Sequence, residues 1–225
     1  MSAIDWRQIK LVVFDVDGTL YDQEGLRRHM LRKLLLHYGV RPWFARELKV
    51  LQSFRRQREA HAGESGGGIE RLQYEWTAQE TGISAERVEA IVTRWMLEIP
   101  LPLLKRYRFA GVDTFLEALK EQGISAQVYS DYPYERKLQA MELMMDGGVD
   151  STQAEVDAFK PHPKGLQYLL ALNDVKPEFC VFIGDREERD GECARNAGVH
   201  SIIVDTKNRR FFNDLTLELR GSSKG

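Results

Sequence analysis

Short apolar runs alternate with amphipathic segments over most of the chain. Four short runs are apolar at most of their positions, and they lie at residues 11–15, 126–129, 179–183 and 201–204. Such runs are typical of parallel strands that are buried on both faces of a sheet. A further strand is expected near Val149, although two glycines precede it and polar residues follow.

Helical spacing fills the intervals between these runs. Apolar residues that recur every three or four positions predict helices, here around 115–119 before Gly123, around 138–145, after Pro163, and over 190–197 before Gly198. Strands that alternate with helices predict a doubly wound, Rossmann-like α/β fold, with helices on both faces of a parallel sheet.

Residues 22–104 interrupt this rhythm because they show helical spacing only. Four helices are expected here. The first is marked by the shared face of Leu26, Met30 and Leu34, and Pro42 can begin the second. The third is marked by Ile69, Leu72 and Trp76, and Ser84 can cap the fourth. Residues 63–68 are rich in glycine, which predicts a flexible connector. The sequence therefore predicts a core made of residues 1–21 and 105–225, with an all-helical insert over 22–104.

Charge follows nearly the same division. Residues 21–110 hold 16 lysines and arginines against 11 acids, a balance of +5, whereas the rest of the chain has a balance of −7. The total of −2 gives no reason to expect a nucleic acid or an anionic membrane as partner. No apolar run approaches the roughly 18 residues that cross a bilayer, and the first residues do not resemble a signal peptide. We therefore expect a cytoplasmic protein, either a monomer or a homodimer.

Candidate chemistry gathers where the expected strands end. The first strand ends in Asp15-Val16-Asp17-Gly18-Thr19-Leu20, and the second ends in Ser130. Lys160 precedes a helix, and another strand ends in Gly184-Asp185, with Asp190 five residues later. Ligands of open parallel sheets bind beyond the carboxyl ends of the strands. Adjacent carboxylates repel each other, so a cation is expected between them.

These motifs, in this order, resemble the haloacid dehalogenase (HAD) superfamily, and in particular its phosphatases with a helical cap between the first and second motifs. The resemblance implies that Asp15 is the nucleophile and Asp17 the general acid and base. It implies phosphate binding by Ser130, Lys160 and Thr19. It also implies a Mg²⁺ site made by Asp15, the backbone carbonyl of Asp17, Asp185 and Asp190, with Asp190 either near the metal or orienting Lys160.

The resemblance further implies a Mg²⁺-dependent phosphomonoester hydrolase that acts through an aspartyl-phosphate intermediate. Its substrate would be a small soluble phosphate, such as a sugar phosphate, phosphoglycolate or a nucleotide monophosphate. A phosphomutase of the same superfamily and a non-catalytic binding or regulatory protein remain as alternatives. Two features depart from the family pattern, namely Asp131, where asparagine is frequent, and the charged run from Arg186 to Arg189.

Residues of the insert are candidates for substrate specificity. Arg55 and Arg58 lie in one basic run, and Arg27 and Arg28 lie in another. A solvated helix face is the simpler interpretation of such runs. The alternative, open for both runs, is that one or two of these residues bind an anionic group on the leaving moiety, since the planar guanidinium group matches carboxylate and phosphate. Arg55 and Arg58 are the candidates selected. Tyr21 follows the first motif closely enough to contact the substrate as well.

Overall fold

The central feature of the fold is a parallel sheet of five strands, in the order β3-β2-β1-β4-β5. A computed structural model gives the structure and describes residues 4–39 and 45–222. The strands are β1 (Leu11–Phe14), β2 (Ser125–Ser130), β3 (Gly147–Asp150), β4 (Cys180–Gly184) and β5 (His200–Ile203). The chain thus crosses outward from the central β1 in both directions, which confirms the predicted doubly wound fold, including the strand near Val149.

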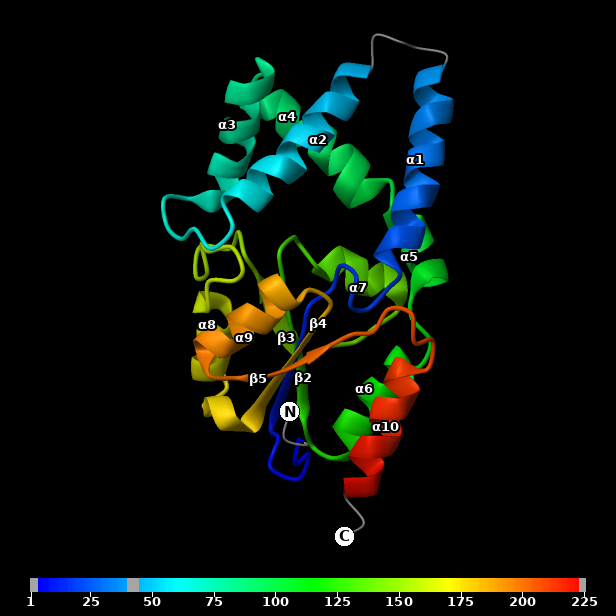
Figure 1. Cartoon of the computed structure of the whole chain (residues 1–225), viewed down its shortest axis with the longest axis vertical. Coiled ribbons are helices and arrows are strands. Elements are labelled where there is room, and N and C mark those ends of the chain that lie inside the picture. The colour runs from blue at the N-terminus through cyan, green and yellow to red at the C-terminus, as the bar shows by residue number, and fades with distance from the viewer. Residues whose placement is uncertain (1–3, 40–44, 223–225) are drawn as a thin grey trace.

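Both faces of the sheet are buried under helices. Alternate residues of β1 point to opposite faces, so Val12 and Phe14 join one hydrophobic cluster while Leu11 and Val13 join the other. Helices α6 (Val112–Glu121) and α10 (Phe211–Ser222) cover the first face, and α8 (Lys164–Leu172) and α9 (Glu192–Ala197) cover the second (Figure 1). This two-sided burial explains why the strands are apolar at consecutive positions.

Two core helices differ from the sequence prediction. Helix α7 (Glu135–Met141) stops before Met145, because Glu142 adopts a left-handed backbone conformation with φ 55° and turns the chain toward β3. Helix α10 was not predicted, although its buried residues Phe212, Leu215 and Leu219 keep helical spacing. Short helical turns η3 (Pro177–Phe179) and η4 (Glu187–Gly191) flank β4.

A helical cap lies between β1 and α6. It contains α1 (Gln23–Gly39), α2 (Ala45–Ala60), α3 (Ile69–Thr81), α4 (Ala85–Val92), the π-helical segment η2 (Thr93–Glu98) and α5 (Leu101–Tyr107). Pro42, predicted to begin the second helix, lies outside the described residues. Ser84 caps α4 as predicted, since its Oγ accepts the amide N–H of Arg87.

Helix α3 buries a different face from the one predicted. Ile69, Gln73 and Thr77 are buried, whereas Leu72 and Trp76 are partly exposed. Gln73 and Thr77 can be buried because both have hydrogen-bond partners. Thr77 donates to the carbonyl of Gln73 at 3.1 Å, and the side-chain oxygen of Gln73 accepts a hydrogen bond from Arg58 of α2. The apolar spacing therefore marked the helix and its buried residue Ile69, but it did not indicate the burial of Gln73 and Thr77.

The two segments that join cap and core run side by side. Tyr21 forms an antiparallel bridge with Arg108. The Asp22 amide donates to the Tyr107 carbonyl at 2.8 Å, and the Phe109 amide donates to the Leu20 carbonyl at 3.0 Å. This paired strap fixes where the cap begins, directly beside the end of β1.

The glycine-rich segment 63–68 is docked on the core, so the prediction of a flexible connector was wrong. The Gly66 amide donates to the Asp157 carbonyl at 2.8 Å, and the Asp157 carboxylate accepts the Ile69 amide at 2.7 Å. The Phe159 amide donates in turn to the Glu64 carbonyl at 2.9 Å. The glycines of this segment have positive φ values between 77° and 84°, so they allow backbone turns that other residues rarely adopt. Among the helices described, none has the length and apolar character needed to cross a bilayer.

Candidate active site

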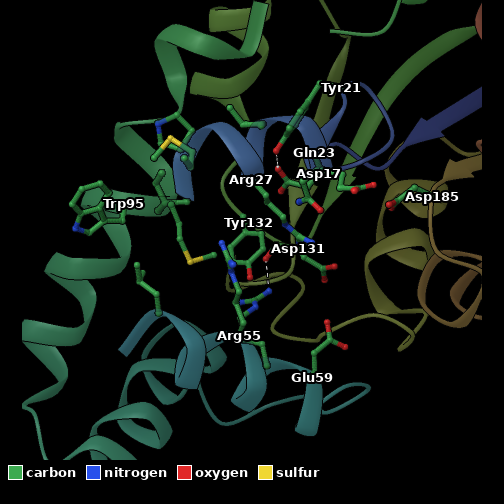
Figure 2. Close-up of a pocket in the computed structure, with 18 of the residues that line it drawn as sticks. Asp17, Tyr21, Gln23, Arg27, Arg55, Glu59, Trp95, Asp131, Tyr132 and Asp185 are labelled. Carbon is green, nitrogen blue, oxygen red and sulfur yellow. Dashed lines mark hydrogen bonds between the residues drawn. The ribbon is translucent and has the colours of Figure 1, made fainter. Parts of the chain in front are cut away.

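Parallel strands bring the sequence motifs to one edge of the sheet. Asp15 follows β1, Ser130 ends β2 and Asp185 follows β4. Because the carboxyl ends of parallel strands face the same way, these residues lie together, and Lys160 joins them from the segment before α8. Figure 2 shows Asp17 and Asp185 on this side of a cavity between core and cap.

Lys160 lies between three carboxylates at this edge. Its Nζ donates to Asp15 Oδ1 at 2.6 Å and to Asp190 Oδ1 at 2.7 Å, and it lies 3.6 Å from Asp131 Oδ2. Only 1% of Lys160 is exposed. Burial by itself would lower the pKa of Lys160, but the three carboxylates hold that pKa well above its usual value. The lysine is therefore a fixed, buried cation.

The single positive charge of Lys160 does not balance the negative charge of the surrounding carboxylates. One ligand atom from each of Asp15, Asp185 and Asp190 lies within 4.8 Å of the others. Burial raises the pKa of Asp15 well above its usual value despite Lys160, and burial together with Asp190 raises the pKa of Asp185 to about 7. Three carboxylates with this excess of negative charge fit a divalent cation that prefers oxygen ligands.

Glycines allow the loops of the cluster to approach each other. Gly18 has φ 101°, and a Cβ there would overlap the Asp185 carboxylate. A Cβ on Gly184 would overlap Asp190 in the same way. Asp190 Oδ2 accepts the amide N–H groups of Asp185 at 3.2 Å and Arg186 at 3.1 Å. Asp190 thus both orients Lys160 and shapes the loop that carries Asp185.

Asp17 has its own partners on the cavity side of the cluster. Its carboxylate accepts hydrogen bonds from the Tyr21 hydroxyl and from Lys137 Nζ, the latter at 2.5 Å. Lys137, on α7, is only 6% exposed, and sequence analysis did not select it. One signal was present, because Lys137 lies four residues before Met141 on the buried stripe of its helix. A lysine at such a position needs an anionic partner.

The two hydroxyl candidates are buried beneath the cavity. Thr19 Oγ1 donates to Asp15 Oδ2 at 3.1 Å, which orients that carboxylate. Ser130 Oγ accepts the amide N–H of Tyr132 at 3.2 Å. Neither side chain is exposed, and the cavity lining includes the neighbour Asp131 in place of Ser130.

Asp131 turns toward the cluster and not away from it. Its Oδ1 accepts from Ser151 Oγ at 3.2 Å. Burial by itself would raise the pKa of Asp131, but the charges of Lys160, Arg58 and Arg189 lower it below its usual value. Asp131 is therefore an ionised acid that shares Lys160 with Asp15.

A cavity of about 730 Å³ extends from the aspartates into the cap. Cap residues Tyr21, Gln23, Arg27 and Arg55 line it, together with Tyr132 from the core (Figure 2). Apolar side chains of α1, α2 and η2 line its far end, among them Leu34, Leu48, Leu51, Trp95 and Met96. The lining of the cavity thus changes from the aspartates at one end, past the arginines in the middle, to apolar side chains at the other end.

Arg58 joins cap and core at the edge of this cavity. Its guanidinium group donates to the Gln73 side chain and to the Asp131 carbonyl, the latter at 2.6 Å. It also lies 4.2 Å from the ring centroids of Tyr132 and Phe159. Arg58 is only 6% exposed, and its guanidinium group is occupied by contacts within the protein.

The charged run after β4 provides a second junction between core and cap. Arg186 and Arg189 pair with Glu59 of α2, each at 2.7 Å. Arg189 also donates to the carbonyls of Lys160 and Arg58. Hydrogen bonds from Arg186 and Arg189 lower the pKa of Glu59 to about 2. The unusual charges of this run therefore connect the Asp185 loop to the cap.

Comparison with known proteins agrees with this geometry. The family of haloacid dehalogenase-like hydrolases matches residues 12–204. The chain is 25% identical to phosphoglycolate phosphatase 1 of Pseudomonas aeruginosa over 87% of this chain and 69% of that protein. It is 26% identical to phosphoserine phosphatase of Thermus thermophilus over 88% and 89%.

The fold has close counterparts among solved structures. The putative HAD-hydrolase YfnB of Bacillus subtilis, solved bound to magnesium, superposes with a TM-score of 0.65 and 16% identity, over 94% of this chain and 99% of that one. The chain therefore belongs to the haloacid dehalogenase-like hydrolases, as its four motifs indicate, and its relatives support the HAD-like phosphatase class expected from them.

Proposed function

We propose that the protein hydrolyses phosphomonoesters through a phosphoryl group carried on Asp15, with Mg²⁺ as cofactor. The observation that supports this most is the position of Asp15, held between Lys160 at 2.6 Å and the carboxylates of Asp185 and Asp190, with Asp17 on the cavity side. A carboxylate placed beside cations can attack an anionic phosphoryl group that would otherwise repel it.

The proposed chemistry has two steps. Asp15 attacks phosphorus, the bond from phosphorus to the leaving oxygen breaks, and Asp17 donates a proton to that oxygen. A water molecule then attacks the aspartyl phosphate, Asp17 takes its proton, and inorganic phosphate leaves as the Asp15 carboxylate is restored. Tyr21 and Lys137 hold the Asp17 carboxylate in place between these steps.

The residues present fit Mg²⁺. Asp15, Asp185 and Asp190 would hold the ion, with the Asp17 carbonyl as a further ligand. Bound there, it would offset the repulsion between nucleophile and substrate. Lys160 binds the phosphoryl oxygens, while Ser130 and Thr19 support that site from below. In this proposal Asp190 has both roles, since its carboxylate lies in the cluster and accepts a hydrogen bond from Lys160.

The proposed substrate is a small phosphorylated metabolite whose leaving group lies under the cap. The two relatives named for phosphoglycolate and phosphoserine act on small phosphomonoesters of carboxylic acids. The cavity of about 730 Å³ has room for such molecules. The cap would exclude bulk water and select the leaving group. We keep a cytoplasmic location as part of this proposal.

Phosphate release from a panel of phosphomonoesters, with Mg²⁺ and with EDTA, tests the proposal. We expect Asp15→Asn to lower turnover at least about 1000-fold while the fold is retained. Asp205→Asn removes an exposed carboxylate outside the cavity lining and serves as the matched control. Equal turnover by wild type and Asp15→Asn would refute the mechanism.

The same assay separates the alternatives. An isomerised sugar phosphate without release of inorganic phosphate would identify a phosphomutase. Absence of turnover on every ester, with or without metal, would favour a binding or regulatory protein. The presence of Asp15, Asp17, Lys160 and Asp185 in one cluster argues against the latter, because a binding protein has no need of a nucleophile and a proton donor together.

A further inference from the structure

Two arginines face the middle of the cavity from different cap helices. Arg27 comes from α1 and Arg55 from α2, and both reach toward Tyr132 (Figure 2). In this view they lie between the catalytic side, marked by Asp17 and Asp185, and the apolar end, marked by Trp95. Both side chains keep access to solvent through the cavity.

Neither guanidinium group has an acidic partner in the described part of the chain. The acids nearest in sequence are paired elsewhere, since Glu24 lies 3.8 Å from Arg28 and Glu59 pairs with Arg186 and Arg189. The two arginines also act on each other, because partial burial and the charge of Arg27 lower the pKa of Arg55. Two like charges held close together without a counter-ion favour an anion between them.

Arg58 does not take part in this arrangement. Its donors are already bound to Gln73 and to the Asp131 carbonyl, and its guanidinium group lies against two aromatic rings. The geometry therefore favours Arg27 and Arg55, one residue from each of the two basic runs, over Arg58.

We propose that Arg27 and Arg55 form a site for a second anionic group, carried by the leaving group of the substrate. This proposal rests on the proposed function, because it identifies the far end of the ester whose phosphoryl group binds at Asp15. The planar guanidinium fork binds a carboxylate or a phosphate through two parallel hydrogen bonds. The substrate class is thus a phosphomonoester of an acid, either a carboxylic acid or a second phosphate.

Three esters of matched length test this site. Glycerol 3-phosphate has a neutral leaving group, 3-phosphoglycerate adds a carboxylate, and 1,3-propanediol bisphosphate adds a phosphate. We expect wild type to show a kcat/KM at least about 10-fold higher for one or both anionic esters than for the neutral one, as charged hydrogen bonds allow. The preferred ester identifies which anion the site takes.

Arg27→Gln and Arg55→Gln should each reduce this preference by about 10-fold, mainly through a higher KM for the anionic ester. Arg32→Gln and Lys49→Gln remove the same charge from exposed positions of the same two helices, outside the cavity lining, and should leave all three esters unchanged. The double variant Arg27→Gln/Arg55→Gln should lose the preference.

The outcomes separate the two proposals. Hydrolysis of all three esters at equal kcat/KM, or a preference that survives in the double variant, would overturn the anion site and leave the phosphatase proposal intact. An equal loss in the charge-matched controls would also overturn it, because the effect would then be long-range electrostatics. Failure to hydrolyse any of the three and any ester of the wider panel would overturn both.

Discussion

At the scale of single residues, the site separates two aspartates that are only two positions apart. Asp15 is 4% exposed and shares Lys160 with Asp190, whereas Asp17 turns to the cavity and is held by Tyr21 and Lys137. The backbone turn at Gly18, with φ 101°, allows this divergence. Two chemically identical side chains are thus placed for different tasks by their partners.

This division predicts how Asp17→Asn depends on the leaving group. Asparagine cannot donate a proton to the leaving oxygen, so hydrolysis of alkyl phosphates should fall about 100- to 10,000-fold. A p-nitrophenyl ester needs little protonation and should lose much less in the first step. Single-turnover rates for both esters measure the difference, and Asp15→Asn, which should abolish both, is the reference. Equal losses in Asp17→Asn would contradict the assignment of a proton donor.

At the scale of elements, contacts at several places hold the cap on the core, among them the hydrogen bond from Arg58 to the Asp131 carbonyl. The strap at Tyr21 and Arg108 joins the connecting segments, segment 63–68 docks on Asp157, and Glu59 of α2 pairs with the loop after β4. The last contact ends on Arg189, which also donates to the carbonyl of Lys160. The position of α2 is therefore connected directly to the loops that carry Lys160 and Asp185.

The Glu59 contact predicts a pH-dependent contribution to stability. Because the pKa of Glu59 is lowered from 4.5 to about 2, its stabilising effect is complete above pH 4.5 and is lost as the pH falls toward 2. We expect Glu59→Gln to cost about 0.5–1 kcal/mol at pH 7, since the pair is partly solvated. Urea unfolding should show this cost shrinking below pH 4.5, whereas Glu117→Gln, which removes an exposed carboxylate of α6, should not follow that course. A constant cost at every pH would count against the ion pair.

At the scale of the whole molecule, the core and the cap carry opposite net charges. The core carries the acidic cluster at the end of the sheet, and the basic cap supplies Arg27 and Arg55 above it. Neither part holds the complete site, because the cavity is lined by both. A substrate that bridges the two would neutralise charge in each.

The acidic cluster predicts how Mg²⁺ affects global stability. The pKa of Asp185 is raised from 3.8 to about 7, so the protein without metal loses stability as the pH rises through this range. Mg²⁺ competes with protons for these carboxylates and should raise the Tm more at pH 8 than at pH 5.5. A shift of about 5–10 °C is expected at pH 8 with a hundredfold excess over Kd. Thermal unfolding measures it, with Asp185→Asn as the control, and an equal shift at both pH values would contradict this account.

Much of the fold was predictable because its signals are local. The consecutive apolar residues 11–14 specify a strand that is buried on both faces, and Asp15 follows directly at its carboxyl end. Both features can be recognised without knowing which strands lie beside this one. Helix α10 was missed although its spacing was visible, and the buried face of α3 was misjudged because hydrogen bonds permit Gln73 and Thr77 to be buried. Apolar periodicity does not report such polar burial.

The doubly wound sheet, the motif aspartates at its carboxyl edge and the helical insert were all predictable, because apolar periodicity and strand ends are properties of short segments. The orientation of the basic side chains follows instead from contacts between segments that are distant in the sequence. Lys137 meets Asp17 across 120 positions, and Arg58 meets the Asp131 carbonyl across 73, which leaves Arg27 and Arg55 facing the cavity. A basic run in a sequence shows how much positive charge a helix carries. The direction in which each basic side chain points depends on how the helix packs against distant segments.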